Sequence, residues 1–121
     1  MKPADIVKDF LLTMEARDLE KAKGFLAPGF TMTFPGDVEM TSLEELVAWS
    51  RSRYNWVRKS YDQFDGVAQA DGQFGYCFSR LDGEGLAQVP FSGIRVIDRF
   101  TLRDGKFVDQ KVWNDMAEVR G

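Results

Sequence analysis

The amino-acid sequence predicts an α+β fold, with three N-terminal helices packed on a strongly curved sheet. Three observations predict this class. The 121 residues fit one domain, spanning residues 1–121. Apolar residues recur mainly with a helical period in the first half and alternate with a strand period from Lys59 onward. The later strands are long, and long strands in a small sheet must twist and coil.

The first helix is expected from about Pro3 to Glu15, because proline suits a first helical turn and an apolar stripe follows at helical spacing. Asp18 is a candidate N-cap for a short second helix over residues 19–26. The Pro-Gly pair at 28–29 is expected to end that helix.

Residues 30–34 alternate between apolar and polar side chains and predict a half-buried strand, which the next Pro-Gly pair ends. A third helix is expected over residues 43–57. Thr41 and Ser42 are each followed three positions later by a glutamate, which is the pattern of a capping box. This helix should join the first two on one face of the sheet.

The second half of the chain predicts long strands separated by tight turns. Asp-Gly pairs, which favour hairpin turns, occur at 71–72, 82–83 and 104–105. The simplest arrangement is an antiparallel sheet that buries one face against the helices.

Composition and charge exclude several classes of function. The net charge is −3 and no long basic run is present, which disfavours nucleic acid and anionic membranes as partners. The chain contains no histidine, so acid–base chemistry would depend on Asp, Glu, Tyr, Lys or Arg. Cys77 is the one cysteine, which excludes an internal disulfide. We expect no metal, because metal ligands are not clustered in the sequence, and no cofactor. We expect a cytoplasmic location, since no signal peptide or membrane-spanning stretch is evident.

The strand over residues 93–103 carries one acidic residue on its apolar face. Arginines mark the opposite face, so a slip of one residue would bury three of them. Asp98 is therefore expected to point inward among apolar neighbours. The inward face comprises Ile94, Val96, Asp98, Phe100 and Leu102.

The register of the last hairpin follows from charge. A three-residue loop over 103–105 places Asp98 opposite Gln110, and also turns Val112 and Asn114 inward. A two-residue loop would instead bury Asp109 and Lys111 beside Asp98. The three-residue loop is predicted because it buries fewer charges.

The inner surface is predicted to enclose a largely apolar site for a small molecule, with a few convergent polar groups. Phe74, Tyr76, Phe78 and Arg80 share one face of their strand, which we assign to this surface. The predicted ligand-binding residues are Phe34, Trp49, Tyr54, Tyr76, Phe78, Arg80, Val96, Gln110, Val112 and Asn114.

Two interpretations of Asp98 remain open from the residues alone. In the structural one it is a buried carboxylate paired with Arg80, or hydrogen-bonded to Tyr76 or Gln110, and it does no chemistry. In the catalytic one its desolvated surroundings keep it partly neutral. It would then donate a hydrogen bond to a developing oxyanion, or act as a general acid–base.

The outward sheet face also predicts a partner. Ile97, Phe107 and Trp113 fall on it, with Arg95 opposite Trp113, and a face exposed to water alone would be less apolar. We expect a second copy of the chain to cover this face, with Arg95 stacked on the indole. Scattered exposure of apolar residues is the simpler alternative.

These features together resemble the nuclear transport factor 2-like superfamily, and within it the SnoaL-like group. The segment 98–108 is similar to the terminal hairpin of that superfamily, and 10–26 is similar to its opening helices. The resemblance covers nearly the whole chain. It implies a cystatin-like cone, a fold that hosts isomerases, cyclases, dehydratases and non-catalytic proteins.

The resemblance also implies roles for single residues. Asp98 matches the oxyanion-hole aspartate of ketosteroid isomerases, while Phe10 and Phe34 stand where those enzymes have a tyrosine and a general base. SnoaL-like cyclases work with a single acid–base aspartate and without metal or cofactor. The implied function is cofactor-free isomerisation, cyclisation or dehydration of an apolar carbonyl compound, or non-catalytic ligand or protein binding by the same fold.

Overall fold

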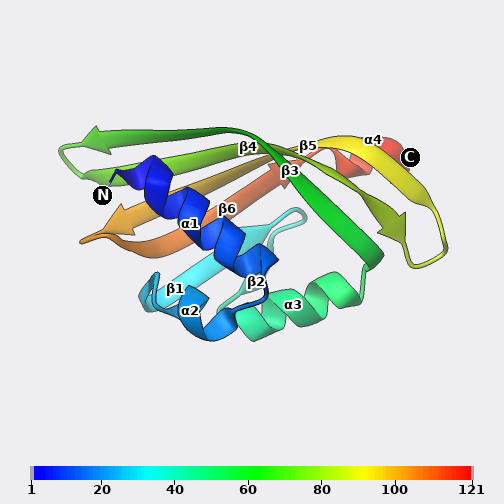
Figure 1. Ribbon diagram of the computed structural model, residues 1–121, viewed down its shortest axis with the longest axis horizontal. Coiled ribbons are helices and arrows are strands. Elements are labelled where there is room, and N and C mark those ends of the chain that lie inside the picture. The colour runs from blue at the N-terminus through cyan, green and yellow to red at the C-terminus, as the bar shows by residue number, and fades with distance from the viewer. Residues whose placement is uncertain (1, 121) are drawn as a thin grey trace.

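A computed structural model describes residues 2–120 as helices on one side of a curved six-stranded sheet (Figure 1). The helices are α1 (Pro3–Glu15), α2 (Leu19–Lys23), α3 (Leu43–Arg51) and α4 (Met116–Arg120). The strands are β1 (Leu26–Phe34), β2 (Val38–Met40), β3 (Tyr54–Gln69), β4 (Gly72–Gly85), β5 (Pro90–Arg103) and β6 (Lys106–Asn114). Within this part of the chain, no helix has the length and apolar character needed to cross a membrane.

The sheet has the strand order β2-β1-β6-β5-β4-β3. All neighbouring strands are antiparallel except β1 and β6, which are parallel, so the sheet is mixed. Figure 1 shows the long strands β3, β4 and β5 bending over α1, with α2 and α3 on the same side. The predicted α+β class, with helices on a curved sheet, is confirmed.

Helix α1 lies close to β4 because β4 has a glycine beneath it. The helix buries Val7 and Phe10 almost completely. A Cβ atom on Gly75 would lie 2.4 Å from Val7 Cγ2, so only glycine permits this approach. The short distance brings α1 down onto the inner face of the sheet.

Three phenylalanines fill the space between α1, β5 and β6. The rings of Phe10 and Phe107 have centroids 5.0 Å apart, and those of Phe100 and Phe107 are 4.5 Å apart. All three side chains are at most 1% exposed. Such aromatic contacts stabilise the fold beyond the apolar area that the rings bury. The rings fill this part of the interior.

Two predicted helix ends are wrong. Helix α2 ends at Lys23, and β1 already begins at Leu26, so the Pro-Gly pair at 28–29 lies inside the strand where its pairing with β6 shifts register. Helix α3 ends at Arg51, and residues 54–57 belong to β3. These residues pair with β4, and such tertiary pairing overrides a local helical pattern.

The predicted turn at 82–83 is also wrong. Both residues lie within β4, and β5 begins at Pro90. Asp82 accepts hydrogen bonds from Ser92 Oγ at 2.7 Å and from the Gly93 N–H at 3.0 Å. A Cβ on Gly83 would lie 2.5 Å from the Trp56 carbonyl oxygen, so this glycine serves close strand packing rather than a turn.

The last hairpin has a two-residue turn and a bulge instead of the predicted three-residue loop. Asp104 and Gly105 both have positive φ, 52° and 74°, as a type I′ turn requires. The register then shifts by one residue near Val108. Because of this β-bulge, Lys111 stays exposed although the loop is short. The bulge is the reason that the charge argument selected the wrong loop.

The bulge also changes the predicted faces of β6. Phe107 pairs with Leu102 and is fully buried in the core, so its assignment to the outward face is wrong. Beyond the bulge, Asp98 pairs with Val112 and Phe100 pairs with Gln110. The pairing is thus two residues away from the predicted one, and an even shift keeps Gln110 and Val112 on the inner face.

Candidate functional site

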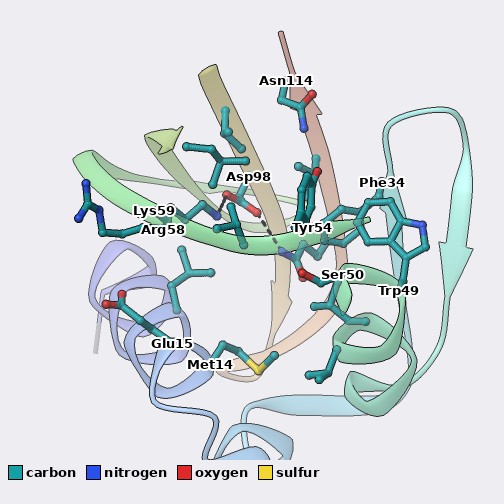
Figure 2. Close-up of a pocket in the computed structure, with 18 of the residues that line it drawn as sticks. Met14, Glu15, Phe34, Trp49, Ser50, Tyr54, Arg58, Lys59, Asp98 and Asn114 are labelled. Carbon is teal, nitrogen blue, oxygen red and sulfur yellow. Dashed lines mark hydrogen bonds and ion pairs between the residues drawn. The ribbon is translucent and has the colours of Figure 1, made fainter. Parts of the chain in front are cut away.

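A cavity of about 380 Å³ lies between α1, α3 and the inner face of the sheet (Figure 2). It is bordered by eight of the residues predicted to form the site, namely Phe34, Trp49, Tyr54, Val96, Asp98, Gln110, Val112 and Asn114. Further apolar lining comes from both helices and includes Leu11, Met14, Leu46 and Val47. The helices and the sheet together therefore make a largely apolar enclosure.

Asp98 lies at the inner wall of the cavity and is held by two partners. The Lys59 ammonium is 2.8 Å from Asp98 Oδ2, and Gln110 Nε2 donates to Asp98 Oδ1 at 3.0 Å (Figure 2). The Asp98 side chain is only 1% exposed. Burial of a carboxylate is costly unless it is paired and hydrogen-bonded, and these two contacts supply that compensation.

Sequence reasoning missed Lys59, although a signal for it exists. The residue lies on β3 opposite Leu81, and alternation places Val57, Lys59 and Tyr61 on the same inner face. The predicted strand begins only at Lys59, and Val57 falls within the predicted helix, so the alternation of Val57, Lys59 and Tyr61 is divided between two predicted elements. A lysine between an apolar and an aromatic residue at this spacing is the pattern that would have identified it.

The predicted partner of Asp98, Arg80, lies on the other side of the sheet. Arg80 Nε is 3.3 Å from Asp62 Oδ2, and both side chains are about half exposed. The expectation that Arg80 borders the cavity is therefore wrong. Arg80 stands opposite Arg95, on the outward face that the arginines of β5 mark.

Tyr76 and Phe78 are on the outward face as well, which corrects their assignment to the cavity. Cys77 pairs with Asp98, so alternation turns its two neighbours away from the inner face. The physical reason is space. Helix α1 crosses β4 closely, and the strand meets it with small residues, Gly75, Cys77 and Ser79, all of them buried.

Aromatic side chains from three elements form one wall of the cavity. The rings of Phe34 and Trp49 are 5.1 Å apart, and the two side chains lie together on one side of the site (Figure 2). Tyr54 packs against Phe91 at 5.6 Å. The Arg53 guanidinium lies 4.6 Å from the Trp49 ring, a cation–π contact that fixes the indole. This wall is apolar and restrained.

Tyr61 closes the site toward the end of α1. Its hydroxyl donates to Glu15 Oε2 at 2.9 Å. Burial, followed by the nearby Glu15 carboxylate, raises the pKa of Tyr61 well above its usual value. The phenol therefore stays protonated, and its proton is already engaged by Glu15.

Asn114 contributes an amide at another side of the cavity. Its Oδ1 accepts from the Met116 N–H at 3.0 Å at the start of α4. Figure 2 shows the amide nitrogen directed toward the interior of the site. Asn114 therefore offers a hydrogen-bond donor.

Among residues 2–120, no three His, Cys, Asp or Glu side chains are grouped so as to hold a metal ion.

Cys77 lies beneath this site and is fully buried. Burial, and next the charge of Asp98, raise the pKa of its thiol to about 12. The thiolate is the nucleophilic form of cysteine. The thiol of Cys77, which stands opposite Asp98 on the adjacent strand, is therefore protonated at neutral pH.

The comparisons with known proteins identify the fold. No family model and no curated protein matches the chain. Among solved structures, a nuclear transport factor 2-like protein from Burkholderia thailandensis has a TM-score of 0.79 at 19% identity, covering 99% of this chain and 95% of that one. TerC, co-crystallised with polyporic acid, has a TM-score of 0.74 at 16% identity, covering 98% and 95%.

A candidate SnoaL-like polyketide cyclase from Jannaschia is also similar, with a TM-score of 0.62 at 16% identity over 81% of this chain and 72% of that one. The chain therefore has the cone fold of the nuclear transport factor 2-like and SnoaL-like proteins, as the resemblance of its terminal hairpin implied. At these identities the likeness describes the fold and does not assign an activity.

The raised pKa of Cys77 predicts a loss of stability in alkali. Above the ordinary thiol value of 9.0 the unfolded chain releases its proton, while the folded chain keeps it until about pH 12. Stability should therefore fall as pH rises through this window. Between about pH 8 and about pH 10, urea denaturation should show a loss about 1 kcal/mol larger for the wild type than for Cys77→Ala. Equal losses in the two proteins would contradict the assignment.

Proposed function

We propose that this protein binds a small, largely apolar carbonyl compound in the cavity and transfers a proton on it without a cofactor. The observation that carries the proposal is the hydrogen-bonded charged group formed by Lys59, Asp98 and Gln110, which adjoins an otherwise apolar cavity. Convergent polar groups in an apolar concavity are typical of small-molecule sites. We call these three residues the charged cluster.

The size and lining of the cavity support the binding role. About 380 Å³ lies within the range of small-molecule sites. The wall formed by Phe34, Trp49 and Tyr54 offers an apolar surface of tilted rings that is held by neighbouring rings. TerC, which is similar in fold, was crystallised with polyporic acid, and this lends support to a ligand in the same fold.

The charged cluster supports proton transfer as the chemistry. Removal of a proton beside a carbonyl needs a proton acceptor, and the enolate that forms needs a nearby positive charge or donor. Asp98 supplies a carboxylate, and Lys59 supplies an ammonium. Isomerisation, aldol-type cyclisation and dehydration all include this step. The apolar lining excludes water and strengthens these electrostatic interactions.

The alternative is a non-catalytic ligand-binding or interaction module, and one surface favours it. On the outward face Phe78, Ile97 and Trp113 stand directly opposite one another on three adjacent strands. Ile97 is 38% exposed and Trp113 is 53% exposed. We call these three residues the outer apolar row. We propose that a second copy of this chain covers the row. We also propose that the protein works in the cytoplasm, which is consistent with its one unpaired cysteine.

The contribution expected from Arg95 to that interface needs correction. Arg95 stands opposite Arg80, and its Nε is 2.5 Å from Asp115 Oδ2, so it does not stack on Trp113. Ile97 is the residue opposite Trp113. The proposed interface is therefore more apolar at its centre than the sequence suggested.

Asp98→Asn tests the catalytic role. It keeps the side-chain volume but removes the charge, so turnover of a carbonyl substrate found by screening should fall by at least about a hundredfold. Asp62→Asn, which removes an exposed carboxylate on β3, is the matched control and should retain activity. Full activity of Asp98→Asn with intact ligand binding would reject proton transfer by this group and favour the non-catalytic alternative.

Trp113→Glu tests the dimer. A charge within the outer apolar row would be buried without a partner in the dimer, so sedimentation should change from dimer to monomer at micromolar concentration. Leu86→Glu, at a similarly exposed site in the loop after β4, should leave the dimer intact. A wild-type protein that sediments as a monomer would remove the proposal.

A further inference from the structure

Lys59, rather than Asp98, is the charged group that a ligand in the cavity would meet first. The Lys59 side chain is 22% exposed and borders the cavity, whereas the Asp98 side chain is 1% exposed. Figure 2 shows the Lys59 chain reaching toward Asp98 along the wall of the site. The carboxylate is thus covered, and the ammonium is the accessible part of the pair.

The ammonium also has hydrogen-bonding capacity to spare. A lysine head group carries three N–H donors. Within residues 2–120, Asp98 Oδ2 is the acceptor that Lys59 reaches. The remaining N–H groups can therefore donate to a ligand, and a donor in an apolar enclosure is stronger than the same donor in water.

The acceptors of the charged cluster are, in contrast, already hydrogen-bonded or buried. Asp98 accepts from Lys59 at one oxygen and from Gln110 at the other. The remaining acceptor, Gln110 Oε1, is a buried atom without a hydrogen-bond partner in the described chain. At this end of the cavity the ammonium of Lys59 is the more accessible group, so an acceptor oxygen on the ligand complements it.

The charges along the cavity favour an oxygen with negative charge. Arg17 and Lys59 border the cavity, against Glu15 and Asp98, although the whole chain has a net charge of −3. Arg58 also borders it, but its side chain is 71% exposed and lies 3.8 Å from Asp82. Both acids are engaged, Asp98 by the charged cluster and Glu15 by Tyr61. The cavity is therefore less negative than the protein as a whole, and its apolar walls strengthen the interaction of the Lys59 ammonium with an anionic oxygen.

We infer that the ligand carries an acidic hydroxyl or an enolisable carbonyl on its apolar body, and that Lys59 binds this oxygen as an oxyanion. Gln110 is then a positioning residue, while Asp98 orients Lys59 and keeps its proposed role as proton acceptor. The inference rests on the proposed binding role and names the chemical class of the ligand. It makes Lys59 the residue that determines specificity. A ligand of the same shape whose oxygen cannot bear charge, such as a methyl ether, binds more weakly.

The test compares 4-nitrophenol, which can form an oxyanion, with 4-nitroanisole, its methyl ether. At a pH where 4-nitrophenol is ionised, the wild-type protein should bind it about tenfold more tightly than it binds 4-nitroanisole, because a hydrogen bond to a charged group is strong. Visible absorption of the phenolate should show that binding lowers the pKa of 4-nitrophenol. Affinity for 4-nitroanisole should not change with pH.

Two variants assign the effect to the ammonium. Lys59→Met should abolish the preference for the phenolate while 4-nitroanisole still binds, and Lys8→Met, at an exposed lysine of α1, should behave as wild type. Since Lys59→Met leaves Asp98 buried without its cation, the double variant Lys59→Met/Asp98→Asn provides a second neutral site that avoids this cost. Retention of the phenolate preference in the double variant would overturn the inference.

The remaining outcomes separate the inference from the proposed function. Equal binding of both probes to the wild type, or a raised pKa of bound 4-nitrophenol, would overturn the role of Lys59 and leave a binding cavity. Val47→Trp fills the cavity from α3. If neither probe binds the wild type more tightly than Val47→Trp, the binding role itself is rejected, and the inference falls with it.

Discussion

The buried ion pair between Lys59 and Asp98 is the interaction on which the site depends. Without this pair, burying the charge of Asp98, whose side chain is 1% exposed, beside apolar side chains would cost much free energy. The two residues belong to β3 and β5, which β4 separates, and Gln110 joins from β6. The charged cluster therefore links three strands across the inner face. The same contacts gather the polar groups of the cavity at one place on that face.

The shape of the cavity follows from how β4 divides its side chains. Small residues face inward, where Gly75 admits α1 to within contact of the strand, and Cys77 and Ser79 lie buried beside it. The larger Tyr76 and Phe78 face outward. Helix α1 can then close over one end of the sheet, while α3 and the aromatic wall border the other. The same division places Phe78 on the outward face, where it completes the outer apolar row between arginine-bearing positions.

Alternation of apolar and charged residues was enough to predict the inward position of Asp98, and the even shift in register kept Gln110 and Val112 beside it. Phe107 was misplaced because a β-bulge changes the face of each residue before it, and no residue type marks this bulge. Arg80, Tyr76 and Phe78 were misplaced because alternation alone does not say which face of β4 is inward, and packing against α1 required the face of small residues. Lys59 was missed because pairing between distant strands, rather than local sequence, extends β3 backward to Tyr54.

A double-mutant cycle on the charged pair tests the central claim most directly. The free energy of unfolding would be measured by urea denaturation for the wild type, Lys59→Met, Asp98→Asn and the double variant. If the two groups form a buried ion pair, the double variant should be less destabilised than the sum of the single variants by about 2 kcal/mol or more. Additivity within about 0.5 kcal/mol would show that the residues do not interact and would contradict the account of the site.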